Sequence, residues 1–169
     1  MSRIILPLRD HITFAGTRSR NTKYGRKFPV MGVEFRLDDS RGLKAWTSLP
    51  MDAIVDTGTE QTLISERVAK AIKLPIESGR RDFKWIRILG GHHPSFSIFV
   101  NAHPLPPGSR FGLQGVPLWV RILAGCTIPV ALIGRDFFVQ DRVADSPMDG
   151  RYDFTLSARE AWVEYRGEE

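Results

Sequence analysis

Several features that are common in other classes of protein are missing from this 169-residue chain. It has one cysteine, Cys126, so no disulfide can form within the chain and nothing requires an oxidising compartment. No apolar run approaches the roughly 20 residues that cross a bilayer, and the apolar stretch near the start is shorter than the roughly 7–15 residues of a signal-peptide core. These absences lead us to expect a cytoplasmic protein with no membrane partner.

What is present fits one globular domain. Hydrophobic residues make up 42% of the chain and charged residues 25%, which suits a single core and excludes a wholly disordered chain. The length excludes enzymes with two large lobes, which need roughly 300 residues or more.

The charge of the chain is uneven. There are 24 Lys and Arg against 19 Asp and Glu, a net charge of +5, and basic residues gather with glycine and small polar residues between residues 16 and 28. Such a composition is typical of a solvated loop, so we divide the chain into a basic N-terminal extension or arm, residues 1–28, and a main domain, residues 29–169. Composition leaves three alternatives for the first 28 residues: a propeptide, an arm or an added strand. Nucleic-acid contact by residues 16–28 is the less favoured interpretation, because a basic patch alone is only an electrostatic footprint.

Short apolar segments separated by glycine and proline predict an all-β architecture with one or two short helices. The expected strands cover residues 30–37, 46–55, 83–89, 96–100, 116–122, 129–133, 152–156 and 161–165. Helices are expected over residues 61–73 and 135–143. Residues 101–115 hold three prolines and three glycines and are expected to be irregular.

The most informative segment is a strand that delivers an aspartate to its end. An apolar run from residue 51 to 55 is followed by Asp56-Thr57-Gly58-Thr59. Glycine permits a tight turn, and a threonine hydroxyl can donate to a carboxylate and favour its charged form. This arrangement holds a reactive carboxylate at a surface, although a strand that ends in an Asp-Gly turn is also a common structural feature.

A second segment, Leu132-Ile133-Gly134-Arg135-Asp136, makes the first more specific. The two motifs together resemble those of the retropepsin-like aspartic proteases. A helical pattern after the aspartate and a glycine-tipped hairpin over residues 83–100 also occur in the family's order. The resemblance covers about residues 30–156.

The resemblance implies an all-β, single-domain acid-protease barrel in which Asp56 is the catalytic aspartate. Thr57 would join the hydrogen bonds that lock two active-site loops together, Gly58 would permit the turn, and Thr59 would donate to Asp56. The remaining support would come from Leu132, Ile133, Gly134 and Arg135, which pass beneath the loop, with Arg135 placed to pair with Glu60.

In the family, a hairpin known as the flap closes over the substrate. The positions of this chain that correspond to it are Trp85, Ile88, Leu89, Gly90 and Gly91, of which Trp85 is the one to test for substrate contact. The chain departs from the family pattern in two respects: the span between the motifs is wider than in compact viral members, and the tip lacks a clear Gly-x-Gly.

Aspartic protease chemistry needs two carboxylates that share a proton, and this chain has one Asp-Thr-Gly. The resemblance therefore implies a two-fold homodimer in which each chain supplies one Asp56 to the cleavage of a peptide or protein substrate. It implies neither a cofactor nor a metal. In viral relatives the chain termini build the dimer sheet, and the strand at residues 161–165 is a candidate for this role.

Other interpretations remain open at this point. His92, His93 and His103 could suggest a metal site, but no acidic ligand lies at useful spacing. Cys126 as a nucleophile has no recognisable histidine partner. The Asp-Thr-Gly-Thr turn also looks like the phosphate-binding turn of actin-like ATPases, which have a much longer chain. The main alternative is a retropepsin-like dimer that binds peptides without cleaving them.

Overall fold

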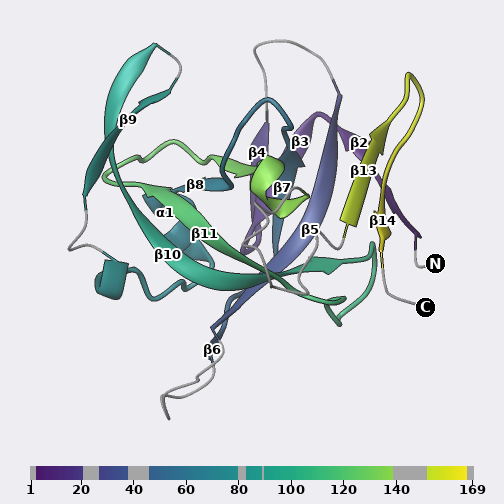
Figure 1. Cartoon of the computed structure of the whole chain (residues 1–169), viewed down its shortest axis with the longest axis horizontal. Coiled ribbons are helices and arrows are strands. Elements are labelled where there is room, and N and C mark those ends of the chain that lie inside the picture. The colour runs from purple at the N-terminus through teal and green to yellow at the C-terminus, as the bar shows by residue number, and fades with distance from the viewer. Residues whose placement is uncertain are drawn as a thin grey trace, which may run out of the picture.

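The computed structural model describes residues 3–20, 27–37, 46–79, 83–88, 90–138 and 152–166, and these are mostly β-structure (Figure 1). In chain order the strands are β1 (Arg3–Leu6), β2 (Leu8–Arg9), β3 (His11–Phe14), β4 (Thr17–Arg20), β5 (Phe28–Leu37), β6 (Trp46–Thr47), β7 (Met51–Val55), β8 (Leu63–Ser65), β9 (Lys84–Ile88), β10 (Gly91–Leu105), β11 (Val116–Leu123), β12 (Ala131–Ile133), β13 (Tyr152–Leu156) and β14 (Ala161–Tyr165). The described residues also form one short α-helix, α1 (Glu66–Ala71), and two 3-10 turns, Ile76–Gly79 and Arg135–Phe137. The all-β prediction is confirmed.

Six strands close into a barrel in the order β5, β10, β11, β8, β12 and β7, because β7 also pairs with β5. Apolar residues alternate along these strands and point inward, as Met51, Ala53 and Val55 do on β7. The long β10 crosses the molecule in Figure 1 and links β9 to β5. The barrel interior is therefore the hydrophobic core.

A second, three-stranded sheet has the order β1, β14, β13 and joins the two ends of the described chain. Its inner face packs on the barrel through Tyr152, whose ring stacks on Phe137 with 5.4 Å between centroids. The Tyr152 hydroxyl donates to the Gln114 carbonyl at 2.7 Å. The strand at residues 161–165, which we expected to reach a partner chain, is thus the central strand of a sheet within one chain.

Residues 3–20 do not form a separate basic arm. β1 pairs with β14, β2 with β5 and β3 with β7, and the side chains of Ile4, Leu6, Ile12 and Phe14 are buried in the common core. Of the alternatives for the start of the chain, strand structure therefore holds for residues 3–20, whose alternating apolar residues share the core of the main domain. Residues 21–26, which include part of the basic cluster, lie outside the described residues.

Two further expectations change. Residues 101–105 are not irregular but continue β10, even though β10 contains Pro94 and Pro104. Pro94 pairs only with β9, and Pro104 only with β5. At each proline β10 therefore has a single neighbouring strand, and a proline is tolerated there because its missing N–H is not needed for a second strand.

The predicted helix over residues 61–73 is shorter, because residues 63–65 are drawn into β8 between β11 and β12. Ser65 then caps α1 by accepting from the Val68 amide, and Lys73, with φ of 61°, ends the helical segment. The predicted helix over residues 135–143 is a single 3-10 turn as far as residue 137, and residues 139–143 lie outside the described part. None of the described helices is both long and apolar enough to cross a membrane.

Candidate active site

Asp56 lies at the point where β7 leaves the barrel. Its strand is flanked by β5 on one side and β12 on the other, and β12 runs parallel to β7 with Ile133 opposite Val55. The Asp56 amide donates to the Ile133 carbonyl at 2.9 Å, which extends this pairing to the aspartate itself. The position of Asp56 is therefore set by the core of the barrel rather than by a free loop.

The turn that follows satisfies both carboxylate oxygens of Asp56. The Gly58 amide donates to Oδ1 at 3.0 Å, and the Thr59 hydroxyl donates to Oδ2 at 3.0 Å. The Thr59 amide closes the turn on the Asp56 carbonyl at 3.1 Å. Asp56 is half-buried, whereas Thr57 and Gly58 are exposed. The result is a carboxylate held in one orientation at the surface.

Gly134 supports the turn from below by close approach of two backbones. A Cβ at this position would lie 2.5 Å from the Gln61 carbonyl carbon and 2.9 Å from the Thr59 carbonyl oxygen. The backbone of Gly134 is extended, with φ of −87°, so the position requires glycine for space rather than for conformational freedom. Next to it, the Arg135 amide donates to the Thr59 carbonyl at 2.8 Å.

The structure adds two residues to the site to which the sequence had given no role. The Asp136 carboxylate accepts from the Thr62 amide at 2.9 Å and from the Thr62 hydroxyl at 2.8 Å, and the Gly134 amide donates to the same hydroxyl at 3.2 Å. Thr62 is fully buried. The Asp136–Thr62 contact therefore fastens the end of the active-site loop to the turn at residues 135–137. In the sequence, the Asp136–Thr62 contact is indicated only by the acidic residue directly after Gly134-Arg135.

Burial raises the pKa of the Asp136 carboxyl above its ordinary value, against the hydrogen bonds from the Thr62 backbone and hydroxyl, which lower it. The folded chain therefore binds this proton more tightly than the unfolded chain does. It follows that the contribution of Asp136 to stability increases as the pH falls toward the ordinary value of 3.8.

Asp136→Ala is expected to lower the free energy of unfolding at pH 7 by about 2–3 kcal/mol, because it leaves the buried amide and hydroxyl of Thr62 without an acceptor. Asp136→Asn keeps one acceptor and should cost less than about 1 kcal/mol. Urea unfolding of both variants and the wild type at pH 7 and pH 5 measures this. The wild type should gain stability relative to Asp136→Asn at the lower pH, and equal losses from the two variants would contradict the assigned role.

The predicted ion pair between Arg135 and Glu60 is not formed within the described part of the chain. Both residues are exposed, and their backbones carry the contact instead: the Asp136 amide donates to the Glu60 carbonyl at 3.1 Å. Thr57 likewise makes no side-chain hydrogen bond to any described residue of this single chain. Its predicted role across a dimer stays a prediction.

The predicted hairpin is present, with β9 and β10 antiparallel and Gly91 opposite Ile88. Gly90 forms the tip with φ of +78°, a conformation that favours glycine. Trp85 on β9 is 70% exposed and Ile88 is half-buried, while Leu89 lies outside the described residues. Trp85 therefore projects into solvent in the isolated chain.

A cavity of about 630 Å³ lies at the opposite end of β7 from Asp56, which does not line it. Its walls are mainly apolar, and its charged groups are Asp52 and Arg9, with 3.9 Å between Oδ2 and Nη1. Burial raises the pKa of Asp52, and the Arg9 charge lowers it. Size alone favours this cavity as a small-molecule site. Its carboxylate already faces a cation, however, so we place the candidate active site at Asp56.

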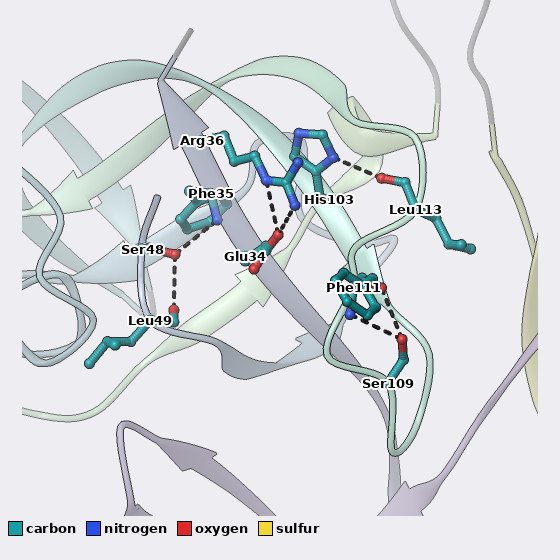
Figure 2. A network of polar contacts seen from close by, with 9 residues as sticks. All are labelled: Glu34, Phe35, Arg36, Ser48, Leu49, His103, Ser109, Phe111 and Leu113. Carbon is teal, nitrogen blue, oxygen red and sulfur yellow. Dashed lines mark hydrogen bonds and ion pairs between the residues drawn. The ribbon is translucent and has the colours of Figure 1, made fainter. Parts of the chain in front are cut away.

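The three histidines are not brought together. His103 lies on β10, where its Nδ1 donates to the Leu113 carbonyl at 2.7 Å, beside Glu34, to which Arg36 donates (Figure 2). His92 and His93 lie near the other end of the strand, at the hairpin tip. Within the described ranges, no three His, Cys, Asp or Glu side chains gather where they could hold a metal ion. Figure 2 shows that His103 instead anchors the loop after β10.

The chain matches no protein-family model and no curated protein. Its function is therefore inferred from the arrangement of its own residues.

Proposed function

We propose that this protein is an aspartic endopeptidase of the retropepsin-like type, active as a two-fold homodimer. The observation that carries the proposal is the Asp56 turn: a half-buried carboxylate fixed by two donors, next to the parallel strand β12 and the close contact of Gly134. The barrel and the hairpin over β9 and β10 support it, because the barrel fixes the position of Asp56 and the hairpin occupies the place in the chain order where the family has its flap.

The mechanism uses one Asp56 from each chain. A water between Asp56 and the partner subunit's Asp56 attacks the scissile carbonyl, and the ionised carboxylate takes its proton. The protonated carboxylate polarises the carbonyl and then protonates the leaving nitrogen. Two like charges at such short range cannot both ionise, so the pair shares one proton, and its two titration steps belong to the pair rather than to one chain.

The exposed Thr57 and Gly58 provide the surface on which the second copy would dock. The edges of β14 are both occupied by β1 and β13, so a partner strand has access only to the outer edges of this sheet. The proposed dimer therefore differs from one in which the chain termini interleave.

Two measurements test the proposal. The purified protein should cleave members of a broad peptide library between about pH 4 and 7, the range in which such a dyad shares its proton. In sedimentation it should be a dimer, and a statine-type transition-state mimic should strengthen the association. A chain that stays monomeric with the mimic present, or that cleaves nothing across this range, would contradict the proposal.

Thr59→Ala is expected to move the acidic limb of the activity profile to higher pH. The substitution removes a hydroxyl whose hydrogen bond to Oδ2 favours the charged form of Asp56. Thr59→Ser keeps the donor and should restore the wild-type limb. The measurement is kcat/KM against pH for the three proteins. An acidic limb at the same pH in Thr59→Ala and in the wild type would show that this hydroxyl does not act on the dyad.

The second candidate is a dimer that binds peptides without cleaving them. Exposed Trp85 and the exposed pair Phe99 and Trp119, with 5.3 Å between ring centroids, favour it, since large exposed aromatic side chains often mark binding surfaces. A dimer that binds library peptides with equal affinity before and after Asp56→Asn, and turns none over, would support this alternative.

A further inference from the structure

The side chain of Arg121 on β11 contacts both the loop after Asp56 and the β9–β10 hairpin. Its Nε donates to Gln61 Oε1 at 2.7 Å, and its Nη1 donates to Ser95 Oγ at 3.0 Å. Gln61 lies five residues after Asp56 in the loop, and Ser95 lies on β10 at the base of the hairpin. The guanidinium therefore connects the loop after Asp56 to the base of the hairpin.

Ser95 carries the contact on to the first strand of the hairpin. Its hydroxyl, which accepts from Arg121, donates to the Lys84 carbonyl of β9 at 2.8 Å. Ser95 is fully buried, so its hydroxyl has no water to replace a lost partner. A continuous series of hydrogen bonds thus runs from Gln61 through Arg121 and Ser95 to Lys84.

The geometry of Arg121 suits a coupling role. Its backbone is fixed, because its amide donates to the Thr62 carbonyl at 2.9 Å, and its side chain is half-buried. No carboxylate pairs with it among the described residues, so its charge is directed at neutral acceptors. Arginine presents several donors in a rigid fork, which lets one side chain hold two acceptors at a fixed separation.

We infer that Arg121 is a positioning residue that couples the hairpin to the active-site loop. When the hairpin closes on a substrate, the coupling keeps its base in register with the loop that carries Asp56. This inference rests on the proposed function only in naming the hairpin as the cover of the substrate. The coupling itself is a property of the free chain.

The test without substrate is amide hydrogen exchange of β9 (Lys84–Ile88) in the full chain. Gln61→Ala is expected to raise exchange at these amides by about tenfold, roughly the effect of one lost hydrogen bond to a charged group, although Gln61 lies outside the hairpin. Arg121→Gln should have the same effect, and the double variant should add nothing further. Gln114→Ala and Arg159→Gln, which change exposed side chains elsewhere, are the matched controls and should leave β9 unchanged.

Two further variants separate charge from geometry. Arg121→Lys keeps the charge but has one donor atom, so it should behave like Arg121→Gln. Gln61→Glu keeps the acceptor and should retain wild-type exchange. Unchanged exchange in Gln61→Ala, or additive effects of Gln61→Ala and Arg121→Gln, would overturn the coupling. If Arg121→Gln does not fold, Ser95→Ala replaces it in the double variant.

With a cleavable peptide, Arg121→Gln should raise KM by about tenfold and change kcat by less than about twofold, because the hairpin loosens while Asp56 keeps its own donors. A fall in kcat with KM unchanged would overturn the positioning role. If the wild type cleaves no peptide, the proposed function fails, and hydrogen exchange still decides whether Arg121 couples the two segments.

Discussion

Asp56→Asn is expected to reduce kcat/KM for peptide cleavage by about 10⁴-fold or more, because an amide can neither accept the proton of the attacking water nor return it to the leaving nitrogen. Asparagine has nearly the same shape, and its oxygen can still accept from the Gly58 amide. The unfolding free energy should therefore change by less than about 1 kcal/mol. Steady-state cleavage and urea unfolding of the same preparation measure both quantities.

Asp153→Asn is the matched control, since Asp153 lies on β13 and pairs with Arg166. It should retain wild-type activity. Peptide turnover that survives in Asp56→Asn would contradict the mechanism outright, whatever the oligomeric state.

Mixing the wild type with Asp56→Asn tests whether two chains share one active site. In a random 1:1 mixture about half of the wild-type chains pair with an inactive partner, so activity per wild-type chain should fall to about one half. At a ninefold excess of the variant it should fall to about one tenth. Activity that is independent of the added variant would contradict a shared site.

Gly134→Ala is expected to lower the unfolding free energy by about 3 kcal/mol or more, because the added Cβ would lie 2.5 Å from the carbonyl carbon of Gln61. The obstructing atoms are backbone, so relief requires movement of the active-site loop itself. We therefore expect loss of cleavage even in the fraction that remains folded. Urea unfolding and kcat/KM, corrected for folded fraction, measure the two effects.

Gly108→Ala separates this clash from the general effect of replacing a glycine. Gly108 has φ of +76° and no atom within 4 Å of the added Cβ, so the substitution should cost only about 1 kcal/mol of backbone strain. If the two variants lose the same stability, the close contact beneath the loop is not what Gly134 provides.

The sequence predicted the Asp56 turn better than its surroundings. Asp56 and Gly58 could be recognised because each is required by a local constraint, a carboxylate at a strand end or a tight turn. The hairpin could be recognised from its glycine tip. The Asp56 turn and the hairpin tip depend on a few neighbouring residues, which a linear sequence displays directly. Gly134, whose close contacts are with Gln61 and Thr59 much earlier in the chain, was recognised only through the resemblance of the two motifs together.

Features that depend on distant residues were missed. Thr62 and Asp136 are 74 residues apart, and Gln61 and Arg121 are 60 apart, so neither contact has a signal within a short window. The strands in residues 3–20 were not predicted, because the basic residues that follow them are typical of a solvated loop, although Ile4, Leu6, Ile12 and Phe14 are buried. Their partners, at β5, β7 and β14, become adjacent only when the barrel and the second sheet form.

The three-stranded sheet has a consequence for how the protein would be switched on. Because β14 is paired on both sides by β1 and β13 of its own chain, the sheet that holds both chain ends needs no strand from a second copy. If two copies share the proposed active site, a single chain with this sheet intact would be folded and yet inactive. Enzyme activity would rise with the square of chain concentration when the protein is dilute, so synthesis and local crowding of chains would set the onset of proteolysis.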